Sequence, residues 1–146
     1  MRNIWTLAFA IALAWHAPVV AQTSQTPKII DNPEKLAADV VQMIANGASN
    51  DAASTITEAM AQPTALPTFQ NALKIFDGKK FDFSKKVVDN EIGGALRQII
   101  NYSYVEKLGF VYFRFNFKMT SKGWILASFF FKTETNELLP KDWSAR

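Results

Sequence analysis

The chain of 146 residues contains no cysteine and only one histidine, His16. Without cysteine it forms no disulfide, performs no thiol chemistry and offers no thiolate to a metal. His16 lies in an N-terminal segment that we expect to be removed, so the remaining chain lacks the histidine that Ser-His-Asp and Cys-His catalysis require. These absences exclude His- or Cys-ligated zinc and copper sites. We expect no metal site and no cofactor, and we assign no catalytic residue.

Residues 1–21 have the pattern of a secretory signal peptide. Arg2 supplies a positive charge, Ile4–Trp15 is an apolar run, and Pro18 precedes the small residues Val19-Val20-Ala21. An uncleaved membrane anchor is the alternative, but the apolar run is shorter than the ~20 residues that span a bilayer. No cysteine follows the cleavage position, which excludes a lipoprotein. We expect a periplasmic or secreted protein with no stable membrane insertion after cleavage.

The rest of the chain is organised as an arm and one domain. Residues 22–31 are polar and predict a flexible arm, and residues 32–146 predict a single domain. Asn32 suits a helix N-cap, Pro33 suits the first helical position, and Asn46-Gly47 suits a helix end. Two further helices are predicted at residues 51–62 and 65–76, the latter with one apolar face.

From Lys80 onward the pattern changes to that of strands. Strands are predicted at residues 87–92 and 97–105, with a bulge or bend at Gly93-Gly94 between them, and a hairpin is predicted over residues 110–133. Helices followed by about four antiparallel strands form an α+β fold, in which the N-terminal helices pack on a curved sheet.

The hairpin over residues 110–133 has the clearest sequence pattern of all the predicted elements. Apolar and polar residues alternate in both of its strands, which predicts half-buried strands. A three-residue turn that pairs Thr120 with Trp124 places odd residues opposite odd residues, with Gly123 as a bulge. We expect this turn because it makes one face wholly apolar. The phenylalanines of that face are Phe113, Phe115, Phe117, Phe129 and Phe131.

The opposite, even face mixes aromatic with basic residues. Either the C-terminal tail or a loop covers its apolar side chains, or the face binds a second copy or a protein partner. The candidate interface residues are Tyr112, Arg114, Trp124, Leu126 and Phe130.

The order of elements resembles the NTF2-like (cystatin-like cone) domains, in particular small exported bacterial members of unknown function. The resemblance rests on three N-terminal helices, the run Gly93-Gly-Ala-Leu-Arg-Gln-Ile99 and the Gly123-Trp124 hairpin, and it covers about residues 33–135. It implies a cone that closes over a pocket, and functions that range from ketosteroid-isomerase-like enzymes through ligand carriers to dimerisation modules. The catalytic histidine usual in that family has no counterpart here.

Two kinds of pocket follow from these patterns. An acid, Asp89 or Glu91, with Tyr102 or Tyr104 is the one pair suited to proton abstraction, provided that burial raises the pKa of the acid. A pocket for a small apolar ligand would be lined by the phenylalanines of the odd face with Tyr102 and Tyr104. The same rings would equally fill the cone as a packed core.

The charge of the chain argues against one class of partner, nucleic acid. The net charge is +3 and the lysines are scattered, so we expect no nucleic-acid partner. We therefore expect an exported, non-catalytic interaction or accessory domain, whose partner is a second copy or another protein. Binding of a small apolar ligand is the alternative, and an acid–tyrosine enzyme is the third hypothesis.

Overall fold

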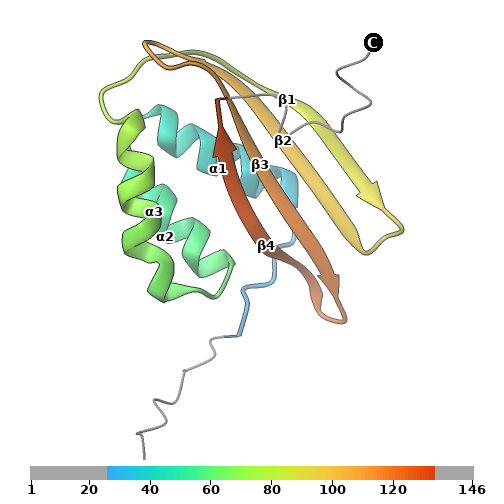
Figure 1. Cartoon of the computed structure of the whole chain (residues 1–146). Coiled ribbons are helices and arrows are strands. Elements are labelled where there is room, and N and C mark those ends of the chain that lie inside the picture. The colour runs from blue at the N-terminus through green and yellow to red at the C-terminus, as the bar shows by residue number, and fades with distance from the viewer. Residues whose placement is uncertain (1–25, 134–146) are drawn as a thin grey trace, which may run out of the picture.

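The computed structural model describes residues 26–133, in which three helices precede a four-stranded antiparallel sheet. Two short 3-10 turns, Pro63–Ala65 and Lys74–Phe76, flank the third helix. The strands lie in the order β1-β2-β3-β4, and the sheet curves with all helices on one side (Figure 1). This confirms the predicted α+β fold. The elements are α1 (Pro33–Ala45), α2 (Ser49–Ala59), α3 (Leu66–Leu73), β1 (Phe81–Ile92), β2 (Leu96–Val105), β3 (Gly109–Thr120) and β4 (Gly123–Lys132).

The first helix begins and ends where the sequence predicts. Asn32 caps α1, because its Oδ1 accepts a hydrogen bond from the Lys35 backbone nitrogen at 2.9 Å. The second helix begins earlier than predicted, at Ser49. The Ser49 side chain is buried and donates to Oδ1 of Asp77 at 2.6 Å, a contact that only the folded chain provides.

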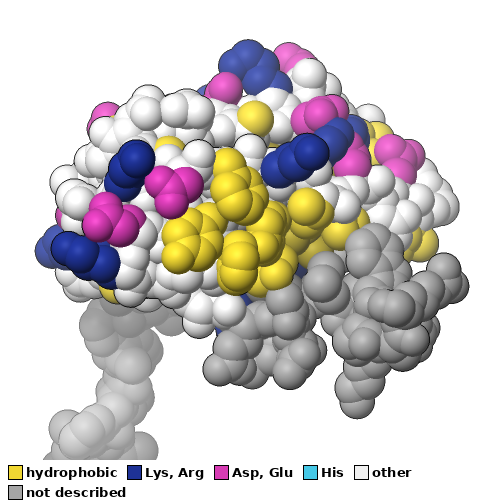
Figure 2. All heavy atoms as spheres, turned by 90° about the horizontal axis from the view of Figure 1, so that it is seen from above, with side chains coloured by type: hydrophobic (Ala, Val, Ile, Leu, Met, Phe, Trp, Pro, Cys, Tyr) yellow, Lys and Arg dark blue, Asp and Glu magenta, His cyan; other side chains and the backbone are white. Residues whose placement is uncertain are grey.

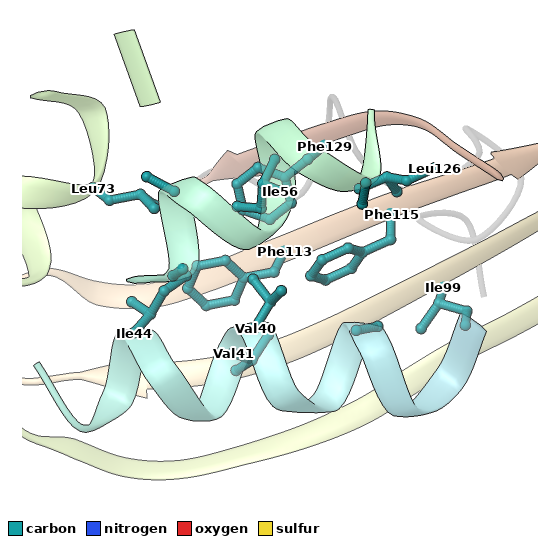
Figure 3. Close-up of a cluster of buried hydrophobic side chains, with 14 of the residues drawn as sticks. Val40, Val41, Ile44, Ile56, Leu73, Ile99, Phe113, Phe115, Leu126 and Phe129 are labelled. Atoms are coloured by element: carbon teal, nitrogen blue, oxygen red, sulfur yellow. The ribbon is translucent and has the colours of Figure 1, made fainter. Parts of the chain in front are cut away.

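The sheet has an inner face, which packs against the helices, and an outer face on the other side. Side chains of α1 point toward the phenylalanines of β3, as Figure 3 shows. Removing such side chains from water is the main stabilising term of the domain, at about 2 to 3 kcal/mol for each large one. The core includes Val40, Val41, Ile44, Ile56, Leu73, Ile99, Phe113, Phe115, Phe117, Leu126 and Phe129.

The β3–β4 hairpin differs from the prediction. Thr120 pairs with Gly123, so the turn has two residues, and the register then shifts by one where Ala127 forms a bulge. Beyond the bulge Phe115 faces Phe129, as predicted. Between the turn and the bulge, however, the even residues of β4 lie on the inner face. A bulge leaves no mark in a simple alternation pattern, so the sequence did not reveal it.

Strand β1 is also longer and less regular than predicted. It begins at Phe81, and register shifts at Asp82 and Val87 interrupt its pairing with β2. Gly93 and Gly94 form the tight turn into β2, with φ angles of 60° and 65° and a hydrogen bond from Ala95 N to Ile92 O. Positive φ at two consecutive positions explains the glycine pair.

The end of the predicted flexible arm is part of the fold. Ile30 donates its backbone N–H to the Trp124 carbonyl at 2.8 Å, and its side chain is buried in the core. The predicted signal peptide, most of the arm and the chain after Thr133 lie outside the described residues. Within residues 26–133, no helix is both long and apolar enough to cross a membrane.

Candidate functional site

Aromatic side chains gather on the outer face of the sheet. Strand pairing places them in neighbouring rows, since Tyr102 lies opposite Tyr112 and Tyr104 lies opposite both Phe83 and Phe110. We call this group the aromatic patch; it consists of Phe83, Tyr102, Tyr104, Phe110, Tyr112 and Phe130.

Tyr102 is the centre of the patch. Its ring centroid lies 5.3 Å from that of Phe83, 5.1 Å from that of Phe110 and 5.0 Å from that of Tyr112. Tyr104 meets Phe110 edge-on at 5.1 Å. Stacked, tilted and edge-on contacts of this kind are favourable arrangements of aromatic rings, so the rings of the patch support one another.

The patch leaves large apolar groups in contact with water. Phe83, Phe110 and Phe130 are 45 to 47% exposed, whereas Tyr112 is only 8% exposed because its neighbours cover it. Burial raises the pKa of Tyr112 above its ordinary value. Figure 2 shows hydrophobic side chains gathered on the face of the molecule that is seen from above, with basic and acidic side chains beside them. Exposed apolar side chains gathered in this way are typical of interaction surfaces.

Arg114 lies at the edge of the patch. Its guanidinium carbon lies 5.0 Å from the centroid of the Phe130 ring, a cation–π contact. Its Nε is buried and has no hydrogen-bond acceptor. A buried N–H without a partner costs about 1 to 3 kcal/mol, which makes this donor an unusual feature of the patch.

The other half of the outer face is polar. Gln98 donates to Asn116 at 3.0 Å, and Asn116 donates to Ser128 at 2.8 Å, which forms a ladder across three strands. A hollow of about 300 Å³ lies here, with the half-exposed Ile92 and Leu96 at its edge.

The predicted interface residues divide between the two faces. Tyr112, Arg114 and Phe130 lie on the outer face. The placement of the other two on that face was wrong: Leu126 is 2% exposed in the core, and Trp124 packs against the same core. The reason is the two-residue turn, which moves both onto the inner face until the bulge at Ala127.

The predicted pocket residues also divide. Phe113, Phe115, Phe117 and Phe129 are at most 4% exposed, and Phe131 contacts the same cluster. Phe129 lies 5.0 Å from Phe115 between ring centroids, and the buried Phe76 lies 5.1 Å from Phe131. These rings pack against one another and against the helices. Tyr102 and Tyr104 do not join them, because their parity on β2 places them on the outer face.

The predicted acid–tyrosine pair does not form. Asp89 lies opposite Ile99 and Glu91 lies opposite Arg97, which places both acids on the inner face. Tyr102 and Tyr104 lie on the outer face, so the sheet separates each acid from each tyrosine. Alternation along a strand decides the face, and the bulge at Val87 changes that alternation between the start and the end of β1.

Asp89 instead belongs to an ion-pair network at the open edge of the inner face. It accepts hydrogen bonds from Arg97 Nε at 2.8 Å, Arg97 Nη2 at 2.9 Å and Lys86 Nζ at 2.9 Å. The bonds from Arg97, and secondarily the bond from Lys86, lower the pKa of Asp89 from 3.8 to about 2, against the opposing effect of its partial burial. Lys86 also bonds Glu34 of α1, and these two carboxylates raise the pKa of the lysine. Asp89 is therefore an ionised structural group, not a proton acceptor near neutral pH.

A smaller hollow of about 200 Å³ lies between α1 and β1. Its walls include Glu34, Lys86 and Asn101 together with small apolar residues of α1. Asn101 is 6% exposed, and the charged Glu34 and Lys86 beside it pair with each other. The hollow is thus a gap beside a structural network.

The prediction from sequence missed Phe83 and Phe110 as members of the patch. Both are about half exposed and both contact Tyr102. The alternation Phe81-Asp-Phe83 was a signal for a strand, but its face depended on the pairing of β1 with β2.

No known protein-family model matches this chain, and a search of curated proteins finds no match. The resemblance to NTF2-like domains therefore stays a prediction.

Proposed function

We propose that this chain is an exported, non-catalytic interaction domain that binds a protein partner through the aromatic patch. The observation that carries the proposal is the ring cluster around Tyr102, with Phe83, Phe110 and Phe130 half exposed on a strand-built surface. Aromatic residues and arginine are enriched at the centres of protein interfaces, because they bury large areas at a small entropic cost. Export rests on the signal-peptide pattern of residues 1–21.

A binding role agrees with the chemistry available elsewhere in the described residues. The acid that sequence analysis singled out is held ionised by Arg97, and the phenylalanines of the inner face pack into the core. The proposal therefore places function on the outer face and not between the helices and the sheet. A cone-shaped NTF2-like module that serves as an accessory subunit is compatible with this assignment.

Photo-cross-linking in the native export compartment tests the proposal. Benzoylphenylalanine replaces Phe110 in one variant and Ile75 in a matched control. Ile75 is 44% exposed but lies in the turn after α3, in the helix layer. We expect cross-links to another polypeptide from position 110 and not from position 75. Equal cross-linking at the two positions, or none to another chain, contradicts the proposal.

Light scattering of the chain without residues 1–21 identifies one class of partner. If the chain forms a dimer that Phe110→Ser and Phe130→Ser both weaken and Ile75→Ser leaves unchanged, the partner is a second copy of this chain. A monomer at high micromolar concentration excludes the homodimer and directs the search to other proteins.

A further inference from the structure

We propose that the chain's own C-terminal segment, residues 134–146, docks across the outer face and covers the aromatic patch in the free protein. The patch is suited to an extended segment that carries bulky apolar side chains and acidic groups.

The first observation is the position at which β4 ends. Its last residue, Lys132, pairs with Tyr112, and Tyr112 pairs with Tyr102. Tyr102 in turn pairs with Lys85 of β1. The chain therefore leaves the sheet on the row of residues that crosses the patch, and a segment that continues along this row meets the rings directly.

The second observation is length. An extended chain covers at most ~3.5 Å per residue, so residues 134–146 reach up to roughly 45 Å. The distance from β4 to β1 is three strand spacings, or about 15 Å. The segment is long enough to cross the sheet even in a bent conformation.

The third observation is chemical complementarity. The segment carries Leu138, Leu139 and Trp143, which match a surface of half-exposed rings. It also carries the acids Glu134, Glu137 and Asp142. On the patch side, Arg114 has a buried Nε without an acceptor. A carboxylate or backbone carbonyl of the segment would supply that acceptor, and a carboxylate would make the bond charge-assisted.

The docked segment would occupy the same surface as a partner, so the two would compete for the patch. This consequence rests on the proposed function, whereas the docking itself requires no partner. A segment bound within the same chain competes at a high effective concentration, so a partner must bind the patch more tightly than the segment does.

Paramagnetic NMR on the chain from residue 22 onward tests the proposal. Because the chain has no cysteine, Ser144→Cys provides a single site for a nitroxide label. We expect strong broadening of the amide signals of Tyr102, Phe110 and Tyr112, and none in α2 or α3. Leu138→Ser combined with Trp143→Ser should abolish the broadening, while the matched pair Thr135→Ala and Asn136→Ala should preserve it.

Three results would overturn the proposal. Broadening confined to residues next to Lys132 means that the segment does not dock. Broadening that persists in the Leu138→Ser, Trp143→Ser variant means that these two apolar side chains do not hold the segment on the patch. Broadening that appears only when a labelled chain is mixed with a separate isotope-enriched chain means that a second copy supplies the segment. Each of these leaves the cross-linking test at position 110 intact, so failure of the docking is distinguishable from failure of the proposed function.

Discussion

Arg97 donates from two guanidinium nitrogens to both carboxylate oxygens of Asp89, at 2.8 and 2.9 Å, across the β1–β2 edge of the inner face. Their side chains are 21% and 22% exposed, which is buried enough for the pair to matter to stability. The pair also settles the role of the acid, because a carboxyl with its pKa lowered to about 2 does not accept a proton near neutral pH.

We predict that Asp89→Asn makes the free energy of unfolding less dependent on pH below about pH 4. The folded-state pKa of about 2 lies below the ordinary value of 3.8, so ionised Asp89 stabilises the fold above pH 4. That stabilisation, about 2 kcal/mol at most, is lost as the pH falls from about 4 to about 2. Urea unfolding at several pH values measures it. Glu91→Gln, on the same strand, serves as the control. The prediction is contradicted if Asp89→Asn loses as much unfolding free energy between about pH 4 and pH 2 as the unchanged chain does.

Gly123→Ala should destabilise the domain through a clash. Gly123 has φ of 131°, and a Cβ at this position would lie 2.8 Å from Cγ2 of Ile29. We expect a loss of about 2 to 3 kcal/mol, measured by thermal or urea unfolding. Gly78→Ala meets no atom within 4 Å and should cost only the backbone strain, about 1 kcal/mol. If Ile29→Ala does not recover part of the loss in a double variant, the clash is not the cause.

Phe115→Ala and Phe110→Ala form a matched pair on β3. Phe115 is fully buried and Phe110 is 47% exposed. We expect the first to cost about 3 to 5 kcal/mol, because it leaves a cavity, and the second less than about 1 kcal/mol. Chemical denaturation compares them directly. Similar costs for the two variants would mean that the inner and outer faces are assigned incorrectly.

Deletion of Ala127 should be tolerated. Ala127 is the extra residue of the bulge, so its removal lets Phe117–Leu126 and Asn116–Ser128 follow one another in a regular ladder. The expected change in the free energy of unfolding is within about 1 kcal/mol. Deletion of Ile125 is the control, since it moves Trp124 off the core face and should cost more. Cross-strand nuclear Overhauser contacts between Phe117 and Leu126 in the Ala127 deletion check the register.

The prediction of the fold from sequence succeeded where the pattern is local. The Asn32-Pro33 start of α1 follows from a side-chain cap and a fixed φ angle, both of which act within one helical turn. The alternation Phe113, Phe115, Phe117 likewise predicts a strand with one buried face, and all three are buried. The helix start at Ser49 was missed because its contact with Asp77 joins residues that are distant in the chain.

The candidate site was predicted only in part. Tyr112, Arg114 and Phe130 were assigned to one surface by parity within the hairpin. Trp124 was placed on that surface too. A two-residue turn followed by a bulge pairs the residues far from the turn, such as Phe115 and Phe129, in the same way as the expected three-residue turn. Near the turn, only the pairing itself distinguishes the two.

The amino-acid sequence by itself determined the period of each element, and therefore the three helices, the sheet and its phenylalanine face. It also determined, through the absence of cysteine, that no disulfide supports the fold. The tertiary structure decided which face each side chain occupies on strands interrupted by bulges. It brought Phe83 of β1 to Tyr102 of β2 and placed Asp89 on the opposite side of the sheet from both. One shifted residue inverts the face of all that follow in a strand, so the site depends on strand pairing that no local pattern encodes.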